Sequence, residues 1–359
     1  VMDLLEDAFK SEALAETLGG KIAKKSDGVP FFVFEMIRGL KEGQFIRKEA
    51  DGSYVQTKVV EDIEVPSAVK DLIEGRLRGL SRGQRAILDV GAVQGLSFDV
   101  GLTARVLDEK RVRVLQEIAE IERRHGVVKG EASACRFDQN QIQEVLYQGL
   151  LPELRAEYHT LLAKAYAERL RGDPPGEDAV FLASHFLKGT DPKQCLPYLT
   201  AALGYLEESY RNDDAIGLAA RALDTAGLLE SAERIEVLLK RAKRHALRGE
   251  QEMRRVTLDE ARTLAEPNEH LALRAEVLKA LGAYYIDHSD LGAAQEWLEQ
   301  ALELAQKAGD RRTETATTGN LSIVLSRSAR YEEARAQCER HLTLAREIGD
   351  REEEARAMG

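Results

Sequence analysis

The sequence predicts a mainly α-helical protein: a small helical segment, a domain of helices with one hairpin, and a solenoid of stacked helix pairs. Two observations indicate this fold class. Residues 304–311 read LAQKAGDR, and residues 344–351, 40 positions later, read LAREIGDR. A fixed period of this length is typical of stacked helical repeats. The composition of the 359-residue chain agrees, because 31% of its residues are charged and only 8 are prolines.

Residues 1–65 form the first expected domain, a helical segment with a hairpin. An opening helix is indicated by apolar residues at helical spacing, namely Leu4, Leu5, Ala8 and Phe9. A break at residues 26–30 (SDGVP) separates it from a second helix, which ends near Gly43 and carries Phe31, Phe32, Phe34, Ile37 and Leu40. The Asp51-Gly52 pair then predicts the turn of a short hairpin across residues 45–60.

Residues 66–172 form the second expected domain. Pro66 and Ser67 mark the start of a helix, and the apolar pattern predicts helices at residues 67–80, 83–94, 99–107 and 110–124. Two short apolar runs, Val127-Val128 and residues 135–137, are joined by a polar turn and indicate a hairpin. Helices followed by such a hairpin outline a winged helix. Further helices are expected from about residue 140 to about residue 171.

Residues 173–359 form the third expected domain, and they begin with the linker DPPG, whose prolines and glycine end any helix. Large and small residues then follow the spacing of a tetratricopeptide repeat at Leu281, Gly282, Tyr285, Ala294, Leu298 and Ala301. We expect Gly282 and Ala294 to be buried where helices cross. The next copy contains Leu321, Ser322, Leu325, Ala334, Cys338 and His341, whereas earlier copies are weak. The sequence thus predicts a tetratricopeptide-like α-solenoid.

The two ends of the chain carry a further expectation. The 40-residue offset places Gly319 onto Gly359, which is the last residue, and the chain begins with Val1 instead of methionine. We therefore expect an internal piece of a larger protein, truncated at its C-terminus inside a repeat. A targeting signal would then lie outside the sequence in hand.

Composition and motifs argue against several functions. The formal net charge is −11, and most of this acidity lies beyond residue 150, so we expect no nucleic-acid partner. No apolar run approaches the roughly 18 residues of a membrane-spanning helix, so we expect a cytoplasmic protein without a membrane partner. The three cysteines are scattered, no two histidines have metal-ligand spacing, and no Gly-x-x-x-x-Gly-Lys-[Ser/Thr] phosphate loop occurs. We expect no catalytic residue, no metal site and no enzymatic activity in this chain.

Residues 28–35 (GVPFFVFE) resemble the "GNPFFVEE" segment of large regulatory ATPases of the STAND class. These include maltose-activator-like transcription regulators and predicted ATPases fused to adenylate cyclases or serine/threonine kinases. Further segments resemble this family in the same order, at residues 65–80, 87–98, 137–159 and 182–186. The resemblance covers most of residues 11–190, and tandem repeats follow it, as in that family.

In that family the Gly-x-Pro segment opens a helical lid after the nucleotide core, and its proline packs near adenine. The resemblance implies that Gly28 and Pro30 border ATP or ADP in the intact parent, while this chain alone holds no cofactor. The family's winged helix often adds a basic or His residue after the Phe of its motif. Here Gln139 stands at that position, beside Asp138, whose charge would repel a phosphate. Gln139 is therefore not assigned to the site.

The leading interpretation is the regulatory and sensor part of a signalling ATPase, in which a protein or ligand on the repeats switches the nucleotide module. The partner would contact inner-groove side chains of the last repeats, namely Glu276, Lys279, Asp287, Asn320 and Arg327. A plain tetratricopeptide scaffold without a nucleotide switch is the alternative, but a simple scaffold does not need residues 1–170. DNA binding through the winged helix ranks last, because the basic residues at 110–124 are interspersed with acidic ones.

Overall fold

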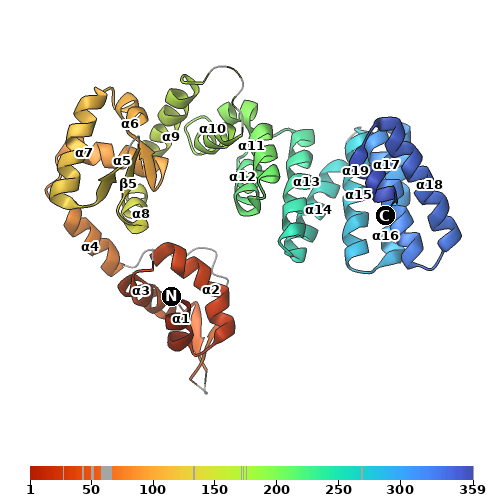
Figure 1. The fold of residues 1–359 in the computed structure, drawn as a ribbon, viewed down its shortest axis with the longest axis horizontal. Coiled ribbons are helices and arrows are strands. Elements are labelled where there is room, and N and C mark those ends of the chain that lie inside the picture. Colours follow the sequence, from red (N-terminus) through yellow and green to blue (C-terminus); the bar gives the residue numbers. More distant parts are fainter. Residues whose placement is uncertain are drawn as a thin grey trace. The chain divides into compact units, whose positions relative to one another are not determined.

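The computed structural model describes residues 1–358 apart from residues 27, 43, 50–51, 58–66, 132–133, 171, 173, 175 and 268–269. The chain divides into two compact units. The first contains Val1–Asp173 and Lys188–Asp191, and the second contains Pro174–Leu187 and Pro192–Gly359. Helices dominate both units (Figure 1). The mainly α fold class predicted from the sequence is confirmed.

The first unit opens with three helices around an apolar core: α1 (Met2–Phe9), α2 (Glu12–Ser26) and α3 (Pro30–Glu42). The sequence predicted one opening helix, but α1 ends early because Lys10 takes a left-handed conformation with φ 50°. A short antiparallel pair follows, formed by β1 (Ile46–Lys48) and β2 (Tyr54–Gln56). The buried side chains of the three helices meet mainly at Leu5, Phe9, Leu18, Ile22, Val33 and Met36.

The rest of the first unit combines helices with a three-stranded antiparallel sheet. The helices are α4 (Ser67–Leu77), α5 (Arg82–Gln94), α6 (Val100–Val106), α7 (Arg111–His125), α8 (Asn140–Gly149) and α9 (Pro152–Ala167). The strand order is β3-β5-β4, with β3 at Ser97–Asp99, β4 at Val128–Gly130 and β5 at Ala134–Phe137. The sequence predicted the β4–β5 hairpin but not β3.

Strand β3 exists because of one side chain and its tertiary neighbours. Phe98 is 1% exposed and lies opposite Cys135 in the register of β3 and β5. Its ring lies 5.3 Å from that of Phe137, centroid to centroid. A Cβ atom at Gly91 would come within 2.9 Å of the Phe98 ring. Helix α5 therefore accepts this strand only because residue 91 carries no side chain.

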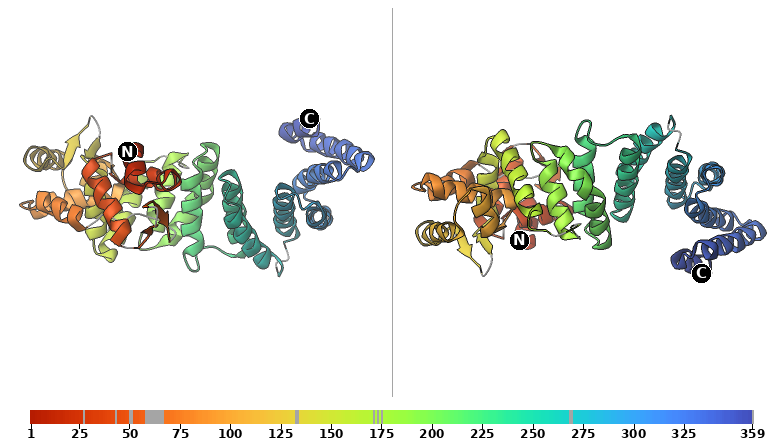
Figure 2. Two further views of the ribbon diagram at one scale, coloured as in Figure 1. Left: turned by 90° about the horizontal axis from the view of Figure 1, so that it is seen from below. Right: turned by 90° about the horizontal axis from the view of Figure 1, so that it is seen from above.

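The second unit consists of helices that run in successive pairs, as Figure 2 shows from two sides. It begins with α10 (Glu177–Leu187), a short 3₁₀ turn (Pro192–Cys195), α11 (Leu196–Glu208) and α12 (Asn212–Asp224). Six longer helices follow: α13 (Ser231–Leu247), α14 (Gln251–Ala265), α15 (Leu271–Asp287), α16 (Leu291–Ala308), α17 (Arg311–Arg327) and α18 (Tyr331–Ile348). The last described helix is α19 (Arg351–Met358).

The 40-residue period is regular in these six helices. The first helices of the pairs, α13, α15 and α17, begin at residues 231, 271 and 311, and the second helices begin at residues 251, 291 and 331. The pair α13–α14, which the sequence marked only weakly, therefore keeps the same phase as the later pairs. Tetratricopeptide-like helix pairs extend over at least residues 231–348.

The turns inside the pairs repeat with the same period. Gly249, Ser289 and Ala329 have positive φ angles of 73°, 59° and 60°. The amide of the next residue donates to the carbonyl oxygen five positions earlier at 3.0 Å in each turn, joining Glu250 to His245, Asp290 to Tyr285 and Arg330 to Leu325. This helix end is the Schellman arrangement, which satisfies carbonyl groups at the last turn.

The helix crossings rest on small residues, as the sequence predicted. Ala294 is fully buried, and a Cβ atom at Gly282 would lie 2.5 Å from Cγ of Leu298. The prediction that Gly282 and Ala294 are buried at crossings is confirmed. Several predicted features lie partly or wholly outside the described residues: the Asp51 turn, the helix start at Pro66, the linker at residues 173–176 and the phase mark Gly359.

Candidate functional site

The five partner-binding residues predicted from the sequence all lie on two neighbouring helices. Glu276, Lys279 and Asp287 belong to α15, and Asn320 and Arg327 belong to α17. Helix α15 packs directly against α17 and, on its other side, against α13. We use the name A face for the surface that these five residues form together with the solvent-reaching side chains at equivalent positions of α13, α15 and α17.

Four of the five predicted residues have polar partners within the solenoid. Asp287 accepts a 2.6 Å hydrogen bond from Arg254 of α14. Arg327 donates at 3.1 Å to the carbonyl oxygen of Ile286, so it reaches the same end of α15. Lys279 lies 3.8 Å from Glu276 one turn away, with side chains 23% and 46% exposed. The ion pair between Lys279 and Glu276 is thus open to a competing ligand.

Asn320 differs from the other four. It is half-buried, and its side-chain amide makes no hydrogen bond to any of the residues that the structure describes. A side-chain amide has two donors and one acceptor oxygen, which match the donor and acceptor of a peptide unit. Ile323 lies about one turn further along α17, and its side chain is 42% exposed. This part of the A face can therefore contact a polypeptide through both polar and apolar groups.

Helix α13 also contributes to this face, although no residue of it was predicted from the sequence. Forty residues before Glu276, Ala283 and Asp287 stand Glu236, Lys243 and Leu247, all exposed. The exposed fraction of Leu247 is 59%. The signal was present in the period itself, but of these three positions only the first keeps its residue type, a glutamate. The A face thus combines acidic, basic and apolar side chains from the first helices of three successive pairs.

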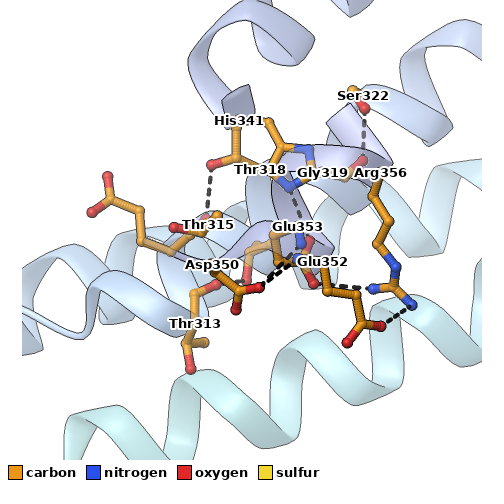
Figure 3. A network of polar contacts seen from close by, with 12 residues as sticks. Thr313, Thr315, Thr318, Gly319, Ser322, His341, Asp350, Glu352, Glu353 and Arg356 are labelled. Carbon is orange, nitrogen blue, oxygen red and sulfur yellow. Dashed lines mark hydrogen bonds and ion pairs between the residues drawn. The ribbon is translucent and has the colours of Figure 1, made fainter. Parts of the chain in front are cut away.

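A second polar cluster lies at the end of the described solenoid (Figure 3). His341 of α18 is 3% exposed, and its Nε2 atom lies 2.9 Å from Oε2 of Glu353 in α19. Arg356 donates to the other oxygen of Glu353 at 3.0 Å. The Asp350 side chain accepts from the amides of Glu352 and Glu353 at 3.1 Å each, which caps α19. The contact of His341 with Glu353 binds α19 to α18.

The buried polar side chains of α17 are satisfied inside the protein. Thr315, Thr317 and Thr318 donate to the carbonyl oxygens four residues earlier at distances of 2.6–2.8 Å. Glu314 is 4% exposed and accepts from Arg311 and Arg340 at 2.9 Å each, and from Gln306 at 3.2 Å. Burial alone would raise the pKa of Glu314, but these three hydrogen bonds outweigh it, so its pKa lies below the ordinary value.

Gly28 and Pro30 form the boundary between α2 and α3. Gly28 has φ +71°, and its amide donates to the Ser26 hydroxyl at 3.3 Å. Pro30 is the first residue of α3, where its missing N–H costs no hydrogen bond. Both residues are exposed. The structure thus places the two predicted nucleotide-bordering residues together at an accessible helix N-terminus.

The residues around Gln139 have partners of their own. Gln139 immediately precedes α8. The Asp138 carboxylate lies 2.9 Å from Nζ of Lys129 and 3.7 Å from Nη2 of Arg76. The next two residues bind the end of α2: Asn140 donates to the carbonyl oxygen of Lys24 at 3.1 Å, and Gln141 donates to that of Lys25. This turn therefore joins the N-terminal helices to the sheet-containing part of the first unit.

Other kinds of site find little support in the described residues. Basic side chains of α7 pair with acids nearby on the chain, at 3.3 Å for Arg113 with Glu109 and 2.9 Å for Arg124 with Glu120. Burial raises the pKa of the Cys135 thiol to about 12 and that of Cys195 to about 11. In the part of the chain that the structure describes, no group of three or more His, Cys, Asp or Glu side chains could hold a metal ion. Within the same ranges, every helix is too short or too polar to cross a membrane.

No family model matches the chain, and no curated protein matches it significantly. Several solved structures are distantly similar. One of them is a signal transduction ATPase with numerous domains (STAND) from Pyrococcus horikoshii, which has a tetratricopeptide repeat sensor. It is 12% identical over 99% of this chain and 54% of its own, with a TM-score of 0.38. The chain thus spans about half the length of that protein. Aspartyl phosphate phosphatase F from Bacillus subtilis is 10% identical over 81% of this chain and 72% of its own, with a TM-score of 0.45. BtubC from P. vanneervenii is 17% identical over 55% of this chain and 83% of its own, with a TM-score of 0.41.

Proposed function

We propose that this chain is the sensor and regulatory part of a signalling ATPase, and that its repeats bind a protein or peptide partner on the A face. One observation carries the proposal for the repeats: three equivalent helices, spaced by 40 residues, present side chains of mixed chemistry in register. A partner in extended conformation would meet Glu236, Glu276, Lys279, Asn320, Ile323 and Leu247. Such a surface reads a peptide by polar contacts and apolar anchors.

The first unit supplies the link to the nucleotide module. By the family resemblance, α2 and α3 form the lid, α4–α7 with the three-stranded sheet form a winged helix, and Gly28 and Pro30 border ATP or ADP in the intact parent. The ion pair of Lys25 with Glu144, at 2.6 Å, supports this proposal because it ties the lid to α8. Movement of the lid with bound nucleotide would then shift α8 and the sheet packed against it.

The partner site on the A face can be tested without knowing the natural partner. Peptides selected from a random displayed library against the full chain would be measured against a double variant, Lys279→Glu with Asn320→Ala. The matched control is Arg335→Glu on α18, whose side chain is 77% exposed. We expect the double variant to lose binding by about tenfold or more, since each charged or hydrogen-bonded contact contributes about 1–3 kcal/mol.

The outcome that would overturn this assignment is equally specific. Selected peptides that bind the double variant and the parent chain equally well, but lose affinity for Arg335→Glu, would place the site on α18. The nucleotide part of the proposal needs a separate experiment, because a plain scaffold would give the same peptide result. Calorimetry with ATP on the chain joined to its nucleotide core, with and without Pro30→Ala, separates the two functions.

A further inference from the structure

We propose that a cavity between α14, α15 and α16 binds a small apolar carboxylate, such as the carboxyl-terminal residue of a polypeptide or a free acid of similar size. The cavity has a volume of about 240 Å³. Its walls come from the end of α14 (Arg262, Ala265 and Glu266), the first half of α15 (Arg274, Val277 and Leu278) and the middle of α16 (Trp297 and Gln300).

This cavity is separate from the A face. Successive residues of a helix are about 100° apart around its axis, so Arg274, Val277 and Leu278 share one side of α15. Glu276, Lys279 and Ala283 lie on the opposite side by the same geometry. A ligand in the cavity would therefore leave the A face open, and the two sites can be tested independently.

Some of the polar groups at the cavity have no hydrogen-bond acceptor among the described residues. Arg262 is paired with Glu266 at 2.6 Å, so these two charges neutralise each other. The Arg274 guanidinium makes no hydrogen bond or ion pair with any described residue, although the chain has a net charge of −11. The Trp297 indole and the Gln300 amide likewise have no side-chain hydrogen bond within the described part of the chain. Guanidinium and indole groups only donate hydrogen bonds, and a carboxylate is the acceptor that a guanidinium binds best.

The next helix pair, α17–α18, shows which partner an arginine has at the equivalent place. Forty residues after Arg274, Trp297 and Gln300 stand Glu314, Gln337 and Arg340. There Arg340 donates to Glu314 at 2.9 Å, so a guanidinium–carboxylate pair joins α17 to α18. The earlier pair has the guanidinium of Arg274 on its first helix, but the equivalent position on its second helix is Gln300, which is not a carboxylate. An external carboxylate would supply the missing half.

The size and walls of the cavity define the rest of the ligand. Pockets for drug-sized ligands measure about 300–1,000 Å³, so this cavity holds a group of roughly one amino-acid residue. Its floor is apolar, because Val277 and Ala265 are 0% and 3% exposed. The half-buried Trp297 ring adds an aromatic wall. These surfaces favour an aliphatic or aromatic group attached to the carboxylate.

Trp297 provides a direct readout, because it is the single tryptophan of the chain. Titration of the full chain with N-acetyl-leucine or 3-phenylpropionate should change its emission saturably. N-acetyl-leucinamide, which has no carboxylate, should bind about tenfold more weakly or worse. Tighter binding of N-acetyl-leucine than of 3-phenylpropionate points to a polypeptide terminus as the natural source, and the reverse order points to a free acid.

Two variants test the role of Arg274 without disturbing the apolar floor. Arg274→Gln should weaken N-acetyl-leucine by about tenfold or more, whereas Arg312→Gln, an exposed arginine on α17, should change nothing. Gln300→Glu should place a carboxylate beside Arg274, raise the melting temperature and abolish ligand binding. Circular dichroism checks that each variant is folded. The proposal is wrong if the emission of Trp297 does not saturate with either acid, or if the amide binds as tightly as the acid.

Discussion

The imidazole of His341 occupies the space that Gly319 leaves open on the neighbouring helix (Figure 3). A Cβ atom at residue 319 would lie 2.7 Å from Cε1 of His341, closer than van der Waals contact permits. In the preceding pair the equivalent positions, 40 residues earlier, are Lys279 and Ala301. In this sequence comparison the small residue stands on the first helix of one pair (Gly319) and on the second helix of the other (Ala301).

This relationship predicts the effect of a single methyl group. Gly319→Ala should lower the free energy of unfolding by roughly 1–3 kcal/mol, because the ring of His341 has to move. In a protein that already carries His341→Ala, adding Gly319→Ala should instead recover part of the lost stability. The new methyl group then faces an alanine and not the imidazole ring. Urea denaturation of the four proteins in this cycle measures the coupling. Additive losses would contradict the packing relationship.

A second prediction concerns the turn at Ala329. Its φ of 60° is a left-handed backbone conformation, which is strained for a residue with a Cβ atom. The equivalent residue two repeats earlier is Gly249, with φ 73°. Ala329→Gly should therefore raise the stability by about 0.5–1 kcal/mol, since glycine adopts this conformation without steric cost. Thermal unfolding measures the effect. Ala336→Gly in the middle of α18 is the control, and it should lower stability by about 1 kcal/mol.

A third prediction follows from the buried Glu314. Its pKa is lowered in the folded protein, so its contribution to stability is present above the unfolded pKa of about 4.3 and is lost as the pH falls through the folded pKa. Glu314→Gln should cost on the order of 1–2 kcal/mol at neutral pH. The loss should shrink progressively as the pH drops below about 4. Urea titrations at several pH values test this, and a cost that does not change with pH would contradict it.

Much of the helical architecture could be predicted from local signals. Helix α5 begins one residue from its predicted start because Ser81 and Gln84 form a capping box, with bonds of 3.2 and 3.0 Å. Helix α7 agrees with its prediction within a residue at each end, and Gly126 ends it in a left-handed conformation. These boundaries depend on residues close in sequence, which a single chain displays.

What the sequence did not reveal depends on distant residues. Strand β3 has only three residues and is defined by its pairing with β5, in which Phe98 lies opposite Cys135, 37 positions later. The α13–α14 pair keeps the phase of the later pairs through its turn at Gly249, which shares a backbone conformation with the turns at Ser289 and Ala329 but no residue type. The cavity at Trp297 combines three helices, so no contiguous motif marks it.

The proposed link to a nucleotide module gives a fourth prediction. This chain alone should neither hydrolyse ATP nor bind it tightly, because its sequence has no phosphate loop whose amides and lysine would hold the β- and γ-phosphates. In the protein joined to its nucleotide core, Pro30→Ala should weaken ATP binding without unfolding α3. Calorimetry on the two proteins measures both effects. Saturable micromolar binding by residues 1–359 alone would reveal a nucleotide site of a different kind.

The measurement that tests the central claim most directly is amide hydrogen exchange of the full chain with and without a selected peptide. We expect bound peptide to slow exchange in α13, α15 and α17, most strongly around Lys279 and Asn320. Exchange in α16 and α18 should change much less, because these helices do not carry the A face. Protection confined to α14, α16 and α18, with α13, α15 and α17 unchanged, would contradict the proposal that the A face binds the partner.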